Sequence, residues 1–116
     1  ADQKKSGFDP ITNRRNKLID NINKQIVFVE CEIEGEEFEG RKPMKWFWVG
    51  DDNKYRCSIF YGKKAIEIEK GKFSFLSPSL DEMKDTLQMV RECVKQGDLD
   101  GKIEFISKQM RKNFNR

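Results

Sequence analysis

The sequence contains no histidine, and this absence removes the commonest general base of enzymes. Ser-His and Cys-His nucleophilic pairs and histidine-bearing zinc sites are excluded with it. Cys31, Cys57 and Cys93 form no C-x-x-C pair, so we interpret them as reduced, buried side chains. We therefore expect a protein that is not an enzyme and that carries no metal and no cofactor.

Long apolar runs are also missing. No stretch approaches the roughly 18 residues of a membrane span, and no signal peptide opens the chain. We therefore expect a cytoplasmic protein with no membrane partner. The 116 residues are 36% hydrophobic and 37% charged, which is enough for one modest core. The prediction is a single domain over residues 1–116, with residues 1–8 as a mobile tail.

Neither sign of charge dominates, because the net charge is only +3, but the charged residues are unevenly distributed along the sequence. Residues 41–72 carry nine Lys or Arg against four acids, and the last 16 residues carry five against one. Residues 1–24 carry six Lys or Arg against three Asp. Between them and residues 41–72, "ECEIEGEEFE" holds six glutamates in ten residues without the spacing of a calcium loop. The basic segments are typical of a polyanion binder, and the glutamates either keep the protein soluble or mimic an anion.

A first helix is predicted over about residues 10–33. Asp9 followed by Pro10 is a helix-start pattern. Apolar residues then recur at helical spacing, at Ile11, Leu18, Ile22, Ile26, Val29 and Ile33. Residues 26–33 also alternate as a strand would, but the unbroken helical period favours a helix. The "RRNK" cluster at residues 14–17 is either a solvated face of this helix or a phosphate clamp.

Four short strands are predicted next, at about residues 45–49, 54–61, 64–69 and 72–76. Their short connections suit hairpins. Ser79 and Glu82 then form a capping box for a helix to about Gln96, and Asp98 can cap a last helix. The predicted fold class is α+β, with an N-terminal helix, a four-stranded antiparallel meander sheet and two C-terminal amphipathic helices.

The last helix has one apolar face. This face carries Leu99, Ile103, Ile106, Met110 and Phe114. Since a short amphipathic helix at the chain end can pair with a second copy, we expect these residues to form the interface of a homodimer or higher oligomer.

The predicted sheet has two different faces. Strand alternation gives one face an almost wholly apolar set, suited to cover by helices. The other face gathers aromatic and basic residues, namely Lys45, Trp46, Trp48, Arg56 and Phe60, with Lys63, Lys64 and Lys72 at the rim. Flat rings beside cations can stack unpaired bases and hold phosphates. The alternative is that the tryptophans pack under the first helix or in a subunit interface.

Several stretches carry a resemblance. "RRNKLI", "KWFWV", "YRCSIFYGKKAIEIEKGK", "SLDEM" and "GDLDGKIE" resemble a family of small uncharacterised proteins from bacteria and tailed phages. The layout of sheet and helix is also similar to the single-strand DNA-binding modules of the positive cofactor and Whirly families. That resemblance implies DNA binding across the sheet through Trp46, Trp48, Arg56 and Phe60, and assembly through the helix. The long first helix departs from the layout.

Together these features predict a single-stranded nucleic-acid-binding protein, with DNA as the first expectation and RNA left open. It would serve as an accessory of replication or recombination in a bacterium or phage. The alternative is a protein-interaction module, such as a phage product that binds a host protein through a tryptophan hot spot.

Overall fold

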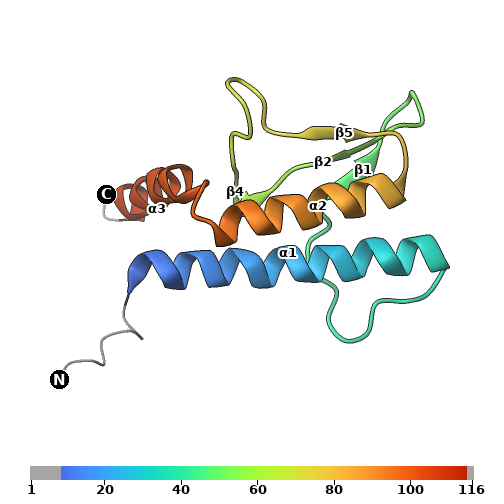
Figure 1. Ribbon diagram of the computed structural model, residues 1–116, viewed down its shortest axis with the longest axis horizontal. Coiled ribbons are helices and arrows are strands. Elements are labelled where there is room, and N and C mark those ends of the chain that lie inside the picture. The colour runs from blue at the N-terminus through green and yellow to red at the C-terminus, as the bar shows by residue number, and fades with distance from the viewer. Residues whose placement is uncertain (1–8, 115–116) are drawn as a thin grey trace.

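The computed structural model describes residues 9–114, except for the side chains of residues 113 and 114, so the expected tail at residues 1–8 lies outside it. Within this range the chain is α+β, with three helices and five short strands (Figure 1). The helices are α1 (Pro10–Glu34), α2 (Leu80–Lys95) and α3 (Asp100–Phe114). The strands are β1 (Phe47–Val49), β2 (Tyr55–Cys57), β3 (Phe60–Tyr61), β4 (Lys64–Ala65) and β5 (Phe75–Ser77).

The ends of α1 and α2 follow from local capping. The Asp9 carboxylate accepts the backbone N–H of Ile11 at 3.1 Å, and Gly35 ends α1 with a φ of 71° that a side chain would disfavour. The Ser79 hydroxyl accepts the N–H of Glu82 at 3.2 Å at the start of α2. Residues 26–33 belong to α1, which confirms the helical prediction for that stretch. α3 begins at Asp100, two residues after the expected cap.

The expected four-stranded meander is wrong. In the described part of the chain, β1, β2 and β5 form one antiparallel sheet in the order β1-β2-β5, and β3 pairs with β4 in a separate hairpin. Between β4 and β5, an isolated bridge joins Glu69 to Lys72. The last strand therefore pairs with β2 rather than with the strand before it.

The expected strand 54–61 is interrupted at Ser58 and Ile59, which belong to neither β2 nor β3. Cys57, Ser58 and Ile59 are all buried, with exposures of 0%, 6% and 1%. The N–H of Ser58 still donates to the carbonyl of Trp46 at 3.0 Å. The carbonyl of Ile59 instead accepts the N–H of Ile66 at 2.7 Å, so the pairing partner of the chain changes at this point. β4 lies between the three-stranded sheet and α3 (Figure 1).

The core lies between the sheet and a pair of helices. α1 and α2 run antiparallel, side by side along the long axis (Figure 1). Their facing side chains are fully buried, at Leu18, Ile22, Val29, Met83, Leu87 and Val94. On the sheet side, Phe47 packs edge-on against Phe28 of α1, with ring centroids 5.4 Å apart.

One ion pair ties α3 to the start of α1. The Nε of Arg15 donates to the Asp100 carboxylate at 2.9 Å, and a second guanidinium nitrogen donates to its other oxygen. This pairing lowers the pKa of Asp100, chiefly through the hydrogen bond from Arg15. The "RRNK" cluster thus supplies a structural contact between helices rather than a fully solvated face.

The cysteines differ from one another. Cys57 is buried, and burial raises the pKa of its thiol to about 12. Cys31 is half-buried and Cys93 is exposed, so the expectation of three buried cysteines is correct for one of them. All three are free thiols.

In residues 9–114, no helix is both long enough and apolar enough to cross a membrane.

Candidate functional site

The outer face of the β1-β2-β5 sheet presents a row of three side chains. Trp48 pairs across the strands with Arg56, and Arg56 pairs with Leu76. Their neighbours Phe47, Cys57 and Phe75 point to the opposite face and pack in or against the core. Trp48 is 45% exposed and Leu76 is 53% exposed, so this face is open to solvent. We call Trp48, Arg56 and Leu76 the outer row.

Arg56 is held in place by the hairpin between β1 and β2. Its two terminal nitrogens donate to the Asp52 carboxylate at 3.0 and 2.9 Å, and one also donates to the carbonyl of Lys54 at 3.3 Å. The guanidinium lies over Gly50, where an added Cβ would come within 2.2 Å of Nη1. The same hydrogen bonds hold the pKa of Asp52 well below its usual range. Arg56 therefore makes three hydrogen bonds within the hairpin, and its charge is balanced by Asp52.

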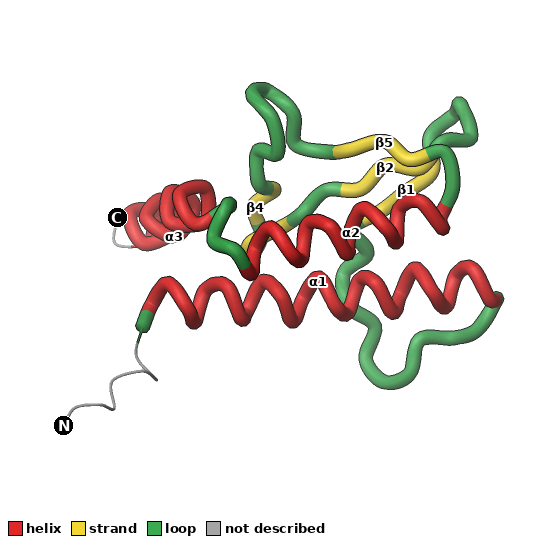
Figure 2. The backbone as a smooth tube through the Cα atoms, in the orientation of Figure 1, coloured by secondary structure: helices red, strands yellow, loops and turns green. Residues whose placement is uncertain are grey.

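Trp46 does not lie on the outer face, which corrects the expectation for this residue. It is 5% exposed, and its ring lies 5.8 Å from that of Phe60, which also packs against the core. Gln25 holds the end of the loop from α1 to β1 (Figure 2) against α1. Its side-chain amide donates to the carbonyl of Met44 at 2.7 Å and accepts the N–H of Trp46 at 3.1 Å. Regular alternation begins only at Phe47.

Lys45 also does not lie on the outer face of the sheet, where it was predicted. Its Nζ lies 4.9 Å from the ring centroid of Phe47, whose side chain points to the covered side of the sheet. It also lies 3.9 Å from Glu32 near the end of α1. Lys45 therefore neutralises part of the glutamate-rich segment. Among residues 9–114, no group of three potential metal ligands is found, and this includes those glutamates.

The rim lysines stay exposed but sit on separate loops. Lys63 and Lys64 belong to the β3–β4 hairpin, and Lys72 follows the turn at Gly71. Lys72 lies 3.6 Å from Glu69, with both side chains about 70% exposed, so that pair is weak. Of the eight predicted contact residues, the structure brings only Trp48 and Arg56 together in one exposed row.

The expected subunit interface on the last helix is wrong for its central residues. Ile103 and Ile106 are 1% and 6% exposed in the core of the chain itself, and Leu99 and Met110 pack against that core. The side chain of Phe114 lies outside the described part. Because α3 needs its apolar face to dock onto α1 and the β3–β4 hairpin, that face is not free for a second copy.

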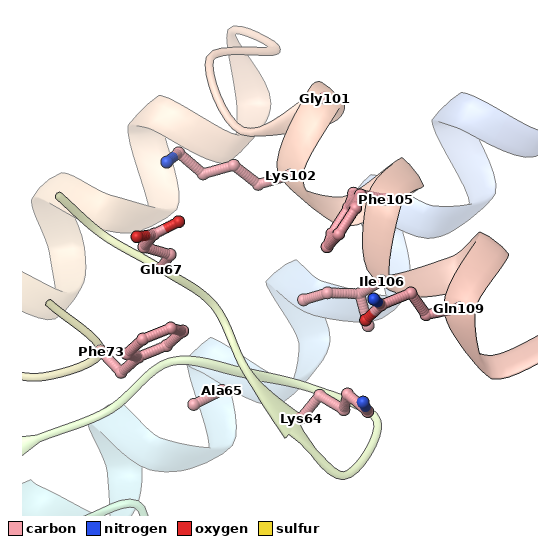
Figure 3. Close-up of a pocket in the computed structure, with 9 residues that line it drawn as sticks. All are labelled: Lys64, Ala65, Glu67, Phe73, Gly101, Lys102, Phe105, Ile106 and Gln109. Atoms are coloured by element: carbon pink, nitrogen blue, oxygen red, sulfur yellow. The ribbon is translucent and has the colours of Figure 1, made fainter. Parts of the chain in front are cut away.

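A groove that the sequence interpretation missed lies between α3 and the segment from β4 to β5 (Figure 3). Phe73 and Phe105 face it from opposite sides, and they are 50% and 62% exposed. Its volume is about 510 Å³. One sequence signal points to it, because Phe105 is a large aromatic residue that falls outside the apolar stripe of α3.

Comparison with known proteins gives no match, whether to a family model, a curated protein or a solved structure. Functional inference therefore depends on the two exposed aromatic regions, the outer row and the groove.

Proposed function

We propose that this protein binds single-stranded nucleic acid on the outer face of its three-stranded sheet, without catalysis. The observation that carries the proposal is the exposure of Trp48 in the outer row. A large flat ring on an open strand can stack on an unpaired base whatever its sequence, and such stacking contributes roughly 1 to 3 kcal/mol per base. Duplex bases are already stacked, so a duplex gains little from this surface.

Exposed lysines near the outer row and on the neighbouring hairpins supply the phosphate contacts in this proposal. Lys54 lies in the turn beside Asp52, and Lys63, Lys64 and Lys70 lie on the two hairpins between β2 and β5. None of these four forms an ion pair with another residue of the described range. Arg56 takes a different part, because its guanidinium is already paired and fixed beside Trp48. One chain is sufficient for this surface.

The test is a titration of labelled single-stranded oligonucleotide, with duplex of the same length as a control. We expect Trp48→Ala to weaken binding about 5- to 150-fold, the equivalent of the stacking energy of one base. Met89→Ala, which removes a 67% exposed apolar side chain from α2, is the matched control and leaves binding unchanged. Three or four lysine contacts predict a log–log salt slope of roughly −2 to −3. Equal binding by wild type and Trp48→Ala contradicts the proposal.

A second candidate function is recognition of another protein through the same face. The specific observation in its favour is the composition of the outer row, where Leu76 is exposed beside Trp48 and Arg56 carries a balanced charge. Tryptophan and arginine are enriched at interface hot spots. The salt titration separates the two candidates, because only the nucleic-acid complex depends on several phosphate contacts.

A further inference from the structure

The groove beside α3 combines two kinds of surface. Its walls are the rings of Phe73, just before β5, and Phe105, on α3, which both point into the open space (Figure 3). Its base includes Ile106, which is 6% exposed and joins the core. A site of about 510 Å³ falls within the roughly 300 to 1,000 Å³ typical of small-ligand pockets. The apolar part of the groove therefore suits a flat ring of moderate size.

Charge at the groove is positive. Lys64 and Lys102 line it, and neither forms an ion pair with another residue in 9–114. The one carboxylate in the lining, that of Glu67, accepts the backbone N–H of Gly71 at 2.6 Å and so is partly satisfied by its own turn. Figure 3 shows the ammonium group of Lys102 on the same side as the Glu67 carboxylate, and that of Lys64 at the other end of the groove. A lining with two lysines, one glutamate and two aromatic rings is complementary to a planar aromatic group that carries anionic substituents.

We propose that this groove holds one unpaired base of a bound strand, with the base against Phe73 and Phe105 and its flanking phosphates near Lys64 and Lys102. This inference rests on the proposed function and adds a second contact region to it. Lys64 connects the two, because it belongs both to the exposed hairpin and to the groove lining. A strand would then make one stacking contact at Trp48 and another between Phe73 and Phe105.

The structure offers two independent variants for a test. Phe105→Ala removes one wall, and Phe105 is 62% exposed, so the change leaves the core intact. Gly101→Leu instead fills the groove from α3, since an added Cβ at Gly101 meets nothing within 4 Å. The two variants act in opposite ways. Phe105→Ala removes a ring on which a base could stack, and Gly101→Leu adds bulk that prevents a base from entering, so both should weaken binding at the groove.

The experiment uses the full chain and a single-stranded oligonucleotide containing 2-aminopurine, a base whose fluorescence falls when it stacks. We expect quenching with wild type, and we expect both variants to abolish the groove-dependent part of it while weakening binding about 5-fold or more. Met89→Ala again serves as the exposed apolar control, and circular dichroism checks the fold of each variant. Lys102→Ala should flatten the salt slope by about 0.7.

The outcomes separate the two proposals. If the strand binds, and Trp48→Ala weakens it, but both groove variants bind like wild type, then the groove inference is overturned and the proposed function stands. If wild type binds no single strand at all, both are overturned. If Phe105→Ala instead turns a dimer into a monomer in sedimentation without changing strand affinity, the groove is a contact between copies and the inference is again overturned.

Discussion

Trp46 and Trp48 stand two residues apart and have opposite environments. Trp46 is 5% exposed at the end of the loop from α1 to β1, and Trp48 is 45% exposed on the outer face of the sheet. In a continuous strand they would share a face, because side chains alternate with a period of two. The difference arises because Gln25 draws the chain at Met44 and Trp46 toward α1, so the strand begins only at Phe47. One tryptophan therefore belongs to the core, and the other is open to solvent.

The largest effect that tests this contrast is on stability. We expect Trp46→Ala to lower the free energy of unfolding by about 3 to 5 kcal/mol, because it leaves a cavity among buried side chains. Trp48→Ala should cost about 1 kcal/mol or less, since surface substitutions seldom cost more. Urea unfolding followed by circular dichroism measures both. Similar losses for the two variants would mean that the outer face is covered, and the contrast would fail.

An intermediate effect on stability is expected at Gln25, whose hydrogen bonds give the two tryptophans their different environments. Gln25→Leu removes both hydrogen bonds to the loop and leaves the buried N–H of Trp46 without a partner. The expected loss is about 1 to 3 kcal/mol in the free energy of unfolding, with faster hydrogen exchange at the Trp46 amide. Gln88→Leu on α2 is the matched control. Unchanged exchange at Trp46 would show that the loop is held by other contacts.

The smallest effect on stability, and a gain in binding, is expected at Asp52. In Asp52→Asn the charge of Arg56 is no longer balanced, so affinity for a single strand should rise, and the salt slope should steepen by about 0.7 if Arg56 then contacts a phosphate. Fluorescence anisotropy at several salt concentrations measures this. Weaker binding by the variant would show that Arg56 serves the site only when Asp52 fixes it.

The ion pair between Asp52 and Arg56 predicts that stability depends on pH. Arg56 lowers the folded-state pKa of Asp52, so the stabilising contribution of the pair is present above the usual carboxylate pKa of about 4. It is lost only as the pH falls from there toward the lowered value. Wild type should therefore lose this increment of stability in acid, while Asp52→Asn, which has no carboxylate at this position, should not.

Features encoded by neighbouring residues were predictable from the sequence. Asp9 with Pro10 marks the start of α1, and Ser79 marks the start of α2, because a capping side chain acts within three residues of the helix end. The helical course of residues 26–33 followed from the period of apolar residues. The placement of Trp48 and Arg56 on one face also followed, because both lie within regular strands that pair directly.

Features that depend on distant partners were not predictable. The pairing of β5 with β2 skips the β3–β4 hairpin, and no glycine or proline marks the interruption of the strand at Ser58 and Ile59. The apolar face of α3 is the same whether it meets a second subunit or its own core. Gln25 looks like an ordinary polar helix residue until the loop supplies a carbonyl and an N–H to its amide.

The two hydrogen bonds of Gln25 also have a consequence for the order of folding. They join residues 19 and 21 positions apart, so the loop they close is long by comparison with a hairpin turn. The amide can meet both backbone groups only after that turn of α1 has formed and pointed the side chain inward. We therefore infer that α1 forms before β1 docks, and that Gln25→Leu speeds unfolding more than it slows folding, because the two hydrogen bonds form late. The entropic cost of closing this loop then arises late in folding, when the sheet forms.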